Sequence, residues 1–466
     1  LALIEAALVD PVDTASLVER KAVAKLQLDS VVYPVLTLPG EITSEIFLKC
    51  GGPEYLTGVP SARNAPLLLL RICRTWTKIA LFTPALWTDL SIGYDGPRKD
   101  VTIAAVAQGI HRWFGRSSTL PISLYFWGDS EKWYTYTKTL LHRQASRLDT
   151  LSLVQDFDAS ALGERGYFAI LQSLTLERTS STALITTFHD SPRLREVNLS
   201  RISPRNVALP YHQLTRFSAS GLSIVDCLGV LRDCPLLKQL SLEAIQAAEH
   251  LPVYPTPVHQ ALEELSIESS SAGTLHFLDL PALRALTLTG ANIWGAFFND
   301  FLRRSSNSLR ALTYIENVPS CFISLEWFRT ANRLVEVTLT TSEADFIQTL
   351  LLELDRSVHP KFLPDLHHLE IASTCHCTID APIIAALQSR RPPVIASLEG
   401  ESDAAAAKSN APTTAHTIEY EVETATLESL CLIRLCSNYD PDWEEIGEIR
   451  WEEMGDIDWD ALYMLG

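Results

Sequence analysis

The chain has 466 residues, about three times the ~150 residues of an ordinary domain, which predicts either several domains or one elongated repeat array. Hydrophobic residues make up 47% and charged residues 20%, a composition that predicts a packed fold rather than a disordered chain. No run of about 18 uncharged apolar residues occurs, so the sequence does not predict a membrane span. The formal net charge is −18 without an evident basic face, which excludes the usual electrostatics of a nucleic-acid partner.

The N-terminal segment favours one short helix. Asp13 is the predicted N-cap, and Leu17, Ala24 and Leu28 recur at spacings of seven and four residues. Two heptads are too few for a coiled coil, so we expect a helix that packs on the rest of the protein. The first ten residues, LALIEAALVD, lack the basic flank and cleavage pattern of a signal peptide.

Two amphipathic helices are predicted next. The first begins near Thr37 or Pro39, carries Ile42 and Ile46 on one face, and ends at the Gly51-Gly52 pair. Asn64 is the predicted N-cap of a second helix, which ends before Pro84. Its apolar residues form one continuous stripe, made of Leu69, Ile72, Cys73, Trp76, Ile79 and Ala80.

A second apolar set accompanies this stripe, comprising Phe47, Leu48, Leu67, Leu68 and Leu70. A helical unit of about fifty residues is too small to enclose both sets in its own core. We therefore expect another protein to cover part of this surface. The competing interpretation is an ordinary helical hairpin inside a core, because most apolar stripes at helical spacing are core.

The order of these residues resembles the F-box, a helical adaptor-binding module. The resemblance rests on Leu38-Pro39 with Glu41-Ile42, on Glu45-Ile46-Phe47, on Ile72-Cys73-Arg74 with Trp76, and on Leu86-Trp87. It covers residues 35 to 92, and the sequence departs from the family pattern at Thr43 and in the long loop from Lys49 to Asn64.

The resemblance implies docking onto the Skp-type adaptor of a cullin-based SCF ubiquitin ligase, so that the adaptor and, through it, a cullin are the expected partners. The residues it implies for adaptor binding are Leu38, Pro39, Ile42, Ile46, Phe47, Leu68, Ile72, Cys73, Trp76, Leu86 and Trp87.

A leucine-rich repeat runs through most of the remaining chain. The template LxxLxL, with hydrophobic residues at positions 1, 4 and 6, recurs about every 24 residues, and the spacing between units varies from 20 to 32 residues. The units begin at Leu148, Leu171, Leu194, Leu214, Leu237, Leu262, Leu283, Leu309, Leu334 and Leu366. Degenerate units are expected at Trp87/Leu90/Ile92 and Ile122/Leu124/Phe126, and a late unit at Leu427/Leu430/Leu432.

Each unit predicts one strand followed by a helix or loop, which gives an α/β fold with parallel strands. Alternation along the strand sends positions 4 and 6 into the core and positions 3, 5 and 7 to the concave face. The ninth position varies in type, so no asparagine ladder is expected. The fold class is thus α/β, a small N-terminal helical F-box followed by an irregular leucine-rich-repeat solenoid.

The C-terminal part breaks the repeat period. Residues 397–417 form an Ala/Ser/Thr/Pro tract, predicted as a low-complexity insertion. Fourteen acidic residues against two basic ones between Glu419 and Asp460 give that segment a net charge of −12. Its tryptophans recur every eight residues, at Trp443, Trp451 and Trp459, which indicates either a final repeat that caps the core or an acidic docking tail.

The predicted domains follow from these boundaries: an N-terminal helical segment (1–33), the F-box (34–92), the repeat solenoid (93–396), the insertion (397–417) and an acidic C-terminal repeat or cap (418–466).

Little in the sequence indicates catalytic chemistry. His367, His368, Cys375, His376 and Cys377 have the side-chain types of metal ligands, but their spacing differs from that of structural zinc sites. No phosphate loop or nucleophile motif occurs, so no catalytic residue, metal or cofactor is expected. The nine cysteines lack the spacing of a disulfide framework, which favours reduced thiols and a location in the cytoplasm and/or nucleus.

The predicted concave face is acidic. Its strand positions include one basic residue, Arg216, among serines and threonines. The acidic residues on it are Glu177, Glu196, Glu243, Glu264, Glu268, Glu336 and Glu370. Such a face would steer a Lys/Arg-bearing substrate segment, although a merely solvated face has the same composition.

The sequence therefore predicts a non-catalytic substrate-recognition subunit of an SCF-type ubiquitin ligase. The F-box would bind the Skp-type adaptor, and the repeats would bind a protein substrate. The alternative is a leucine-rich-repeat interaction scaffold that does not recruit the ligase.

Overall fold

The computed structural model describes residues 19–23, 25, 37–50, 63–94, 103–128, 139–154, 168–177, 184–245, 258–268, 272–290, 295–316, 323–373, 383, 386, 389, 417–420 and 429–434. The chain divides into two compact units. Unit 1 comprises Leu1–Ser91, Asp100–Leu120 and Ile449–Gly466, and unit 2 comprises Ile92–Lys99 and Pro121–Glu448. Most of the predicted N-terminal helix, the loop after Cys50, the insertion and the tryptophan-rich tail lie outside the described residues.

Unit 1 is helical in its described part. Its elements are α3 (Gly40–Cys50), α4 (Leu69–Ile72), α5 (Arg74–Leu81), the 3-10 helix η3 (Pro84–Trp87) and α6 (Ile103–Arg116). Helix α3 agrees with the sequence prediction, and Thr43 donates its hydroxyl to the Pro39 carbonyl 3.1 Å away in the first turn.

The second predicted helix is broken, which corrects the expectation of one continuous stripe. Cys73 is extended, with φ −158° and ψ 163°, and it separates α4 from α5. Its Sγ atom accepts a hydrogen bond from the Trp76 backbone N–H at 3.5 Å, so it acts as the N-cap of α5. Thr77 Oγ1 bridges the break by donating to the carbonyls of Leu70, at 2.8 Å, and of Cys73, at 3.0 Å.

Aromatic side chains form the core of unit 1. Phe47 and Trp87 are fully buried. The Phe47 ring packs edge-on against Trp76, and the Trp87 ring packs edge-on against Trp113 of α6, each with 5.0 Å between centroids. The guanidinium of Arg116 lies 4.4 Å from the centre of the Trp87 ring. Helix α6, expected within the repeat region, therefore packs as part of unit 1.

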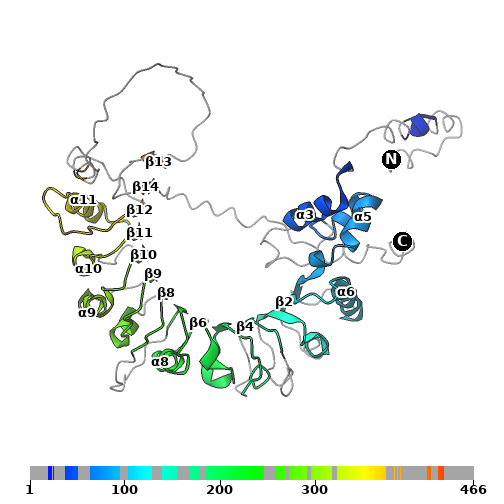
Figure 1. Cartoon of the computed structure of the whole chain (residues 1–466), viewed down its shortest axis with the longest axis horizontal. Coiled ribbons are helices and arrows are strands. Elements are labelled where there is room, and N and C mark those ends of the chain that lie inside the picture. The colour runs from blue at the N-terminus through cyan, green and yellow to red at the C-terminus, as the bar shows by residue number, and fades with distance from the viewer. Residues whose placement is uncertain are drawn as a thin grey trace. The chain divides into compact units, whose positions relative to one another are not determined.

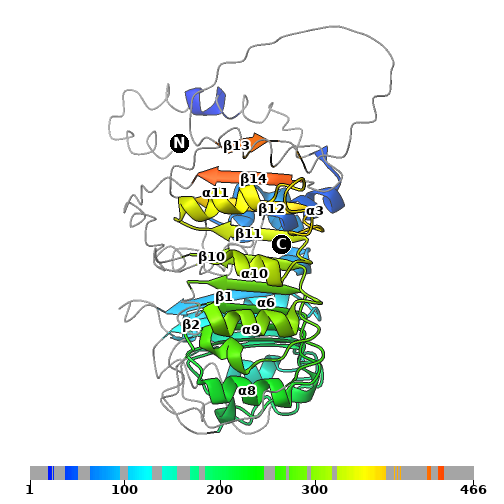
Figure 2. The same cartoon turned by 90° about the vertical axis from the view of Figure 1, so that its left-hand side faces the viewer.

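Unit 2 is built on a parallel sheet whose strands follow one another in chain order (Figure 1). The parallel strands in its described part are β2 (Ile122–Gly128), β3 (Leu148–Val154), β4 (Ser173–Glu177), β5 (Glu196–Ser200), β6 (Arg216–Ser220), β7 (Gln239–Glu243), β8 (Glu264–Glu268), β9 (Ala285–Thr289), β10 (Ala311–Ile315), β11 (Glu336–Thr340), β12 (His368–Ser373) and β14 (Ser429–Arg434). Strand β1 (Asp89–Tyr94) precedes β2 in the sheet order, and β13 (Thr417–Tyr420) pairs antiparallel with β14. Figure 2 shows β14, β12, β11 and β10 one below the other.

The register of the sheet confirms the predicted repeat positions. Position 4 pairs with position 4 and position 6 with position 6 from β3 to β12, as in Leu240 with Leu265 and Leu242 with Ile267. The late unit obeys the same rule, because Leu430 pairs with Leu369 of β12. In the early unit, Leu124 and Phe126 pair with Leu151 and Leu153, and Ile122 pairs with Leu148. These pairs require a register shift between Ile122 and Ser123.

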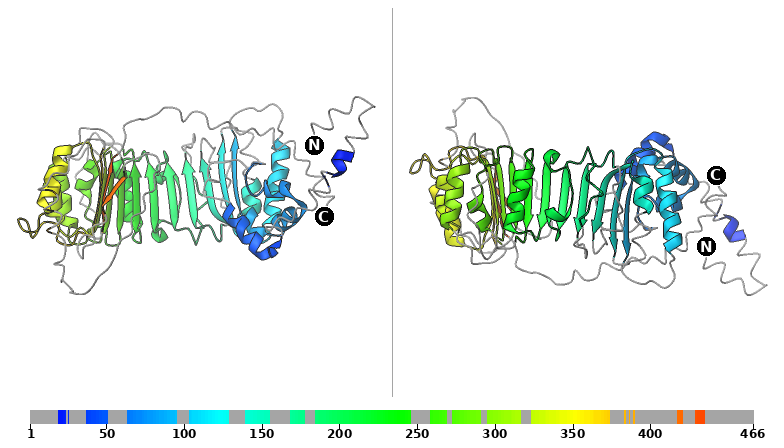
Figure 3. Two further views of the ribbon diagram at one scale, coloured as in Figure 1. Left: turned by 90° about the horizontal axis from the view of Figure 1, so that it is seen from above. Right: turned by 90° about the horizontal axis from the view of Figure 1, so that it is seen from below.

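The core of unit 2 lies between the sheet and the outer connections. In strands β4 to β11, positions 4 and 6 are buried, whereas positions 3, 5 and 7 keep some exposure. Figures 1 and 3 show the helices on one side of this sheet, the outer side of its arc. These outer elements are η5 (Pro204–Asn206), η6 (Tyr211–Gln213), α8 (Ile224–Asp233), η7 (Ala272–Phe277), α9 (Gly295–Ser305), α10 (Leu325–Thr330) and α11 (Ala344–Glu353). Among the described residues of unit 2, no helix lies on the opposite, concave face.

The two buried cysteines of α8 and its C-cap are expected to be unreactive. Burial raises the pKa of Cys227 and of Cys234 to about 12, with a smaller contribution from neighbouring aspartates. At pH 8 the reactive thiolate is therefore only about 10⁻⁴ of each population. Mapping iodoacetamide adducts by mass spectrometry should show fast modification of the exposed Cys50 and slow modification of Cys227 and Cys234. The urea-unfolded chain is the control, and equal rates in the folded chain would contradict the buried placement.

Candidate functional site

Unit 1 exposes an unusual number of large aliphatic side chains. Leu38 is 38% exposed, Ile42 50%, Ile46 40%, Leu68 39% and Ile72 49%. We call these five residues the exposed apolar set. Ile42 and Ile46 lie one turn apart on α3, and Leu68 and Ile72 have the same spacing at α4. Exposed apolar side chains gathered on one small unit mark a surface that another molecule covers.

The structure divides the residues implied by the F-box resemblance into two groups. The exposed apolar set and Pro39 are exposed, whereas Phe47 and Trp87 are fully buried. Cys73, Trp76 and Leu86 are half-buried. The buried pair supports the helices from within, whereas the exposed and half-buried residues have surface that a partner can touch.

Thr43, the departure from the family pattern, does not alter the exposed surface. Its side chain is 2% exposed, and its hydroxyl is satisfied by the Pro39 carbonyl. Ile42 and Ile46 on the same helix point outward. The threonine therefore changes the internal packing of α3 and leaves the outer apolar side chains in place.

The concave face of unit 2 is the second candidate surface. Its central row, at position 5 of the repeats, continues with Glu370 on β12 and consists, from β3 to β11, of small polar side chains: Ser152, Thr175, Asn198, Ser218, Ser241, Ser266, Thr287, Thr313 and Thr338. Positions 3 and 7 are mixed and include most of the predicted glutamates. Because neighbouring strands lie about 4.8 Å apart, side chains at register-paired positions lie close together across strands.

Two of the predicted glutamates belong to one hydrogen-bonded network at position 3. Arg216 Nη1 lies 2.7 Å from Glu196 Oε1, and the Arg216 Nε–H donates to the Gln239 side-chain oxygen. The Gln239 amide then donates to Glu264 Oε2 at 2.7 Å. Arg216 thus offsets the charge of Glu196, whereas Glu264 accepts a hydrogen bond from the neutral Gln239 amide; composition alone does not reveal this.

Two further glutamates form a pair of like charges. Glu243 of β7 and Glu268 of β8 are direct register partners at position 7, and both are exposed. Neither carboxylate has an ion-pair partner within the described part of the chain. Like charges opposite each other on adjacent strands are mildly destabilising. The remaining candidates, Glu177, Glu336 and Glu370, lie on other strands and do not join this pair.

Metal chemistry finds no support in the described part of the chain. His367 and His368 lie at the start of β12, whereas Cys375, His376 and Cys377 fall outside the described residues. Among the described residues, no group of three or more His, Cys, Asp or Glu side chains is arranged to hold a metal ion. Across the same residues, the helices are all too short or too polar to cross a membrane.

Sequence reasoning missed two features of unit 2. It did not foresee the neutralising network around Arg216, because the pairing of position 3 with position 3 is needed to bring Gln239 between Arg216 and Glu264. It also missed a cavity beside α8. The available signal for the cavity was the shortest repeat, the 20 residues from Leu194 to Leu214, followed by a glycine in the next helix.

Comparisons with known proteins add little to this geometry. No family model matches the sequence, and no curated protein matches it. Among solved structures, the crystal structure of human 5T4 (Wnt-activated inhibitory factor 1, trophoblast glycoprotein) has a TM-score of 0.22 and 19% identity, over 36% of this chain and 81% of that chain. A likeness at this TM-score carries no argument. The strand register and buried positions of this chain itself identify unit 2 as a leucine-rich-repeat solenoid, a fold of the protein-interaction type.

Proposed function

We propose that this chain is the substrate-recognition subunit of an SCF-type ubiquitin ligase. Unit 1 would bind a Skp-type adaptor and, through it, a cullin, while the solenoid would bind the protein substrate. The observation that carries the proposal is the exposed apolar set, because its five side chains are F-box anchors by sequence and are exposed on unit 1. In a helical hairpin that packs inside a core, the competing interpretation, such residues would be buried.

The chain itself would act without catalysis. Its contribution is proximity: a substrate held on the solenoid presents its lysines to a ubiquitin-charged enzyme elsewhere in the assembly. The partners of such a ligase reside in the cytoplasm and/or nucleus, which is the location we propose for this chain. Thr43 does not weaken the proposal, because it is buried beneath the exposed helix face.

The test of the proposal is co-expression of the full chain with a Skp-type adaptor, followed by size-exclusion chromatography. A one-to-one complex is the expected result. A well-folded chain that elutes alone would refute the ligase role and leave the alternative, a repeat scaffold that does not recruit the ligase.

The negative charge of the concave face favours a protein substrate with a basic segment. The Glu243–Glu268 pair brings two exposed carboxylates together on this face without an offsetting ion pair among the described residues, and Glu264 lies on the same strand as Glu268. A Lys/Arg-bearing segment would relieve the repulsion between the two carboxylates and be steered toward them.

Reversing Glu243, Glu264 and Glu268 to Lys is expected to weaken binding of a fluorescent Lys/Ser-repeat peptide by roughly tenfold or more at low salt, because exposed ion pairs contribute up to about 1 kcal/mol each. Fluorescence anisotropy at low and high salt measures the change, and the difference should shrink at high salt. Glu326→Lys, on the outer helix α10, is the control for a charge reversal away from the concave face. Unchanged binding by the triple variant would exclude the steering role.

A further inference from the structure

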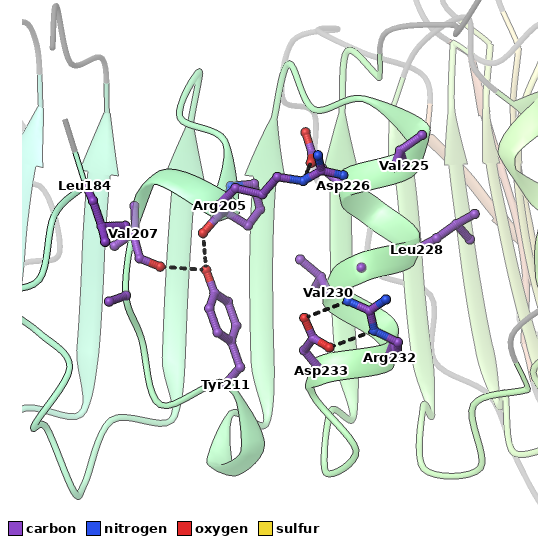
Figure 4. Close-up of a pocket in the computed structure, with 13 residues that line it drawn as sticks. Leu184, Arg205, Val207, Tyr211, Val225, Asp226, Leu228, Val230, Arg232 and Asp233 are labelled. Atoms are coloured by element: carbon purple, nitrogen blue, oxygen red, sulfur yellow. Dashed lines mark hydrogen bonds and ion pairs between the residues drawn. The ribbon is translucent and has the colours of Figure 1, made fainter. Parts of the chain in front are cut away.

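A cavity of about 590 Å³ lies on the outer side of unit 2, beside helix α8 (Figure 4). It arises from unequal repeats. The outer connection after β5 contains two three-residue 3-10 turns, η5 and η6, whereas the connection after β6 contains the ten-residue helix α8. The short turns fill less space than the helix, so a hollow remains between them.

The walls of the cavity are mainly apolar. Figure 4 shows Val207 and Tyr211 on one side and Val230 of α8 on the other. Leu184, which is 58% exposed, also lines the cavity. Gly229 of α8 lines it too, and a Cβ atom added there would meet no atom within 4 Å. Glycine is among the weakest helix formers, yet it stands where a larger side chain would enter the open space.

The polar backbone around the cavity is already satisfied. The Tyr211 hydroxyl donates to the carbonyls of Pro204, at 2.7 Å, and of Val207, at 3.1 Å. Burial is the main reason that the pKa of Tyr211 is raised, so this hydroxyl stays protonated and keeps donating. On the same wall, the Ala208 N–H donates to the Ile185 carbonyl at 2.8 Å. A peptide backbone would find no strand edge here with which to pair.

The charged groups at the cavity occur as internal ion pairs. Arg205 Nε lies 2.9 Å from Asp226 Oδ1, and Arg232 Nε lies 2.9 Å from Asp233 Oδ1. Asp226 also accepts the Ser223 hydroxyl at 2.9 Å. Two cations and two carboxylates give no net charge. A charged ligand would therefore be attracted by one member of each ion pair and repelled by the other. An uncharged ligand avoids this conflict.

We propose that this cavity binds an uncharged, mainly apolar small molecule. Its volume falls within the roughly 300–1,000 Å³ of small-molecule sites, and such sites combine apolar walls with few polar groups. The cavity lies wholly in unit 2, so the proposal is independent of the adaptor-binding role of unit 1.

The test uses two probes with the same ring system. N-phenyl-1-naphthylamine is uncharged, and 8-anilinonaphthalene-1-sulfonate carries a sulfonate. We expect the uncharged probe to show saturable, one-site fluorescence enhancement with the full chain, and the sulfonate to bind at least tenfold more weakly. Gly229→Trp should abolish the site. Gly115→Trp, at another helical glycine whose added Cβ meets nothing within 4 Å, should leave it unchanged.

Folding of the variants is checked separately. Gly229→Leu, which introduces a strong helix former, should also weaken binding of the uncharged probe by tenfold or more. Thermal unfolding followed by circular dichroism should show that both Gly229 variants stay folded. Three results would overturn the proposal: no saturable binding to the wild type, equal binding by the folded Gly229→Leu variant, or tighter binding of the sulfonate than of the uncharged probe.

Discussion

The double replacement Ile42→Asp/Ile72→Asp is expected to abolish co-elution with a Skp-type adaptor and to weaken the affinity at least about 100-fold. Full burial of one aliphatic side chain contributes about 1.5–3 kcal/mol, and each of these two still exposes about half of its surface in the free chain, so its burial against the adaptor would contribute about half of that. Two lost contacts, together with the penalty for placing two carboxylates in an apolar interface, exceed the 2.7 kcal/mol that corresponds to 100-fold. Size-exclusion chromatography and calorimetry of the purified proteins measure the loss.

Matched controls distinguish the loss of adaptor contacts from the unfolding of the chain. Leu352 and Val258 of unit 2 are 43% and 53% exposed, close to the values for Ile72 and Ile42. Leu352→Asp/Val258→Asp should therefore bind the adaptor as the wild type does. Thermal unfolding of both double variants should match the wild type, because none of the four side chains is buried. Adaptor binding that survives in Ile42→Asp/Ile72→Asp would contradict the role of the exposed apolar set.

The helical unit illustrates what a sequence pattern can and cannot predict. Apolar spacing identified α3 and placed Ile42 and Ile46 on one face, because the helical period alone determines which residues share a side. It could not tell that Cys73 adopts an extended backbone, since the pattern of the stripe continues through the break. Nor could it separate exposed Ile72 from buried Phe47, because burial depends on which helix packs against which face.

The repeat region was predictable in much finer detail. Two-residue alternation and a nearly regular period together decide which side chains point inward, so positions 4 and 6 align across strands as the template requires. The irregular features escaped the same reasoning. The shift after Ile122 depends on the packing of the first strands, and the link between Arg216 and Gln239 depends on contacts across strands. The cavity depends on the difference between consecutive outer connections, which no single repeat encodes.

Trp87→Ala is expected to destabilise unit 1 by about 3–5 kcal/mol, the range for removing a large buried aromatic side chain. Trp87 is fully buried, and its indole N–H donates to the Ala80 carbonyl at 2.9 Å. Its ring also packs against Trp113 and beneath the Arg116 guanidinium. Alanine would leave a cavity, remove the indole hydrogen bond to the Ala80 carbonyl and remove the ring that faces the Arg116 guanidinium. Urea denaturation followed by circular dichroism should therefore show a transition at lower urea concentration than in the wild type.

The same variant distinguishes whether Trp87 contacts the adaptor directly or supports the adaptor-binding helices from the core. If Trp87 only supports the core, Trp87→Ala should lose adaptor affinity to the extent that unit 1 is destabilised. Trp87→Phe should then recover much of the stability and of the adaptor affinity, because phenylalanine refills most of the volume. Leu68→Ala, at a 39% exposed position, should lose affinity with little change in stability. A Trp87→Ala chain that keeps wild-type stability but no longer binds the adaptor would instead make Trp87 a contact residue. That result would require the indole to leave the core when the adaptor binds, because in the free chain its surface is fully covered.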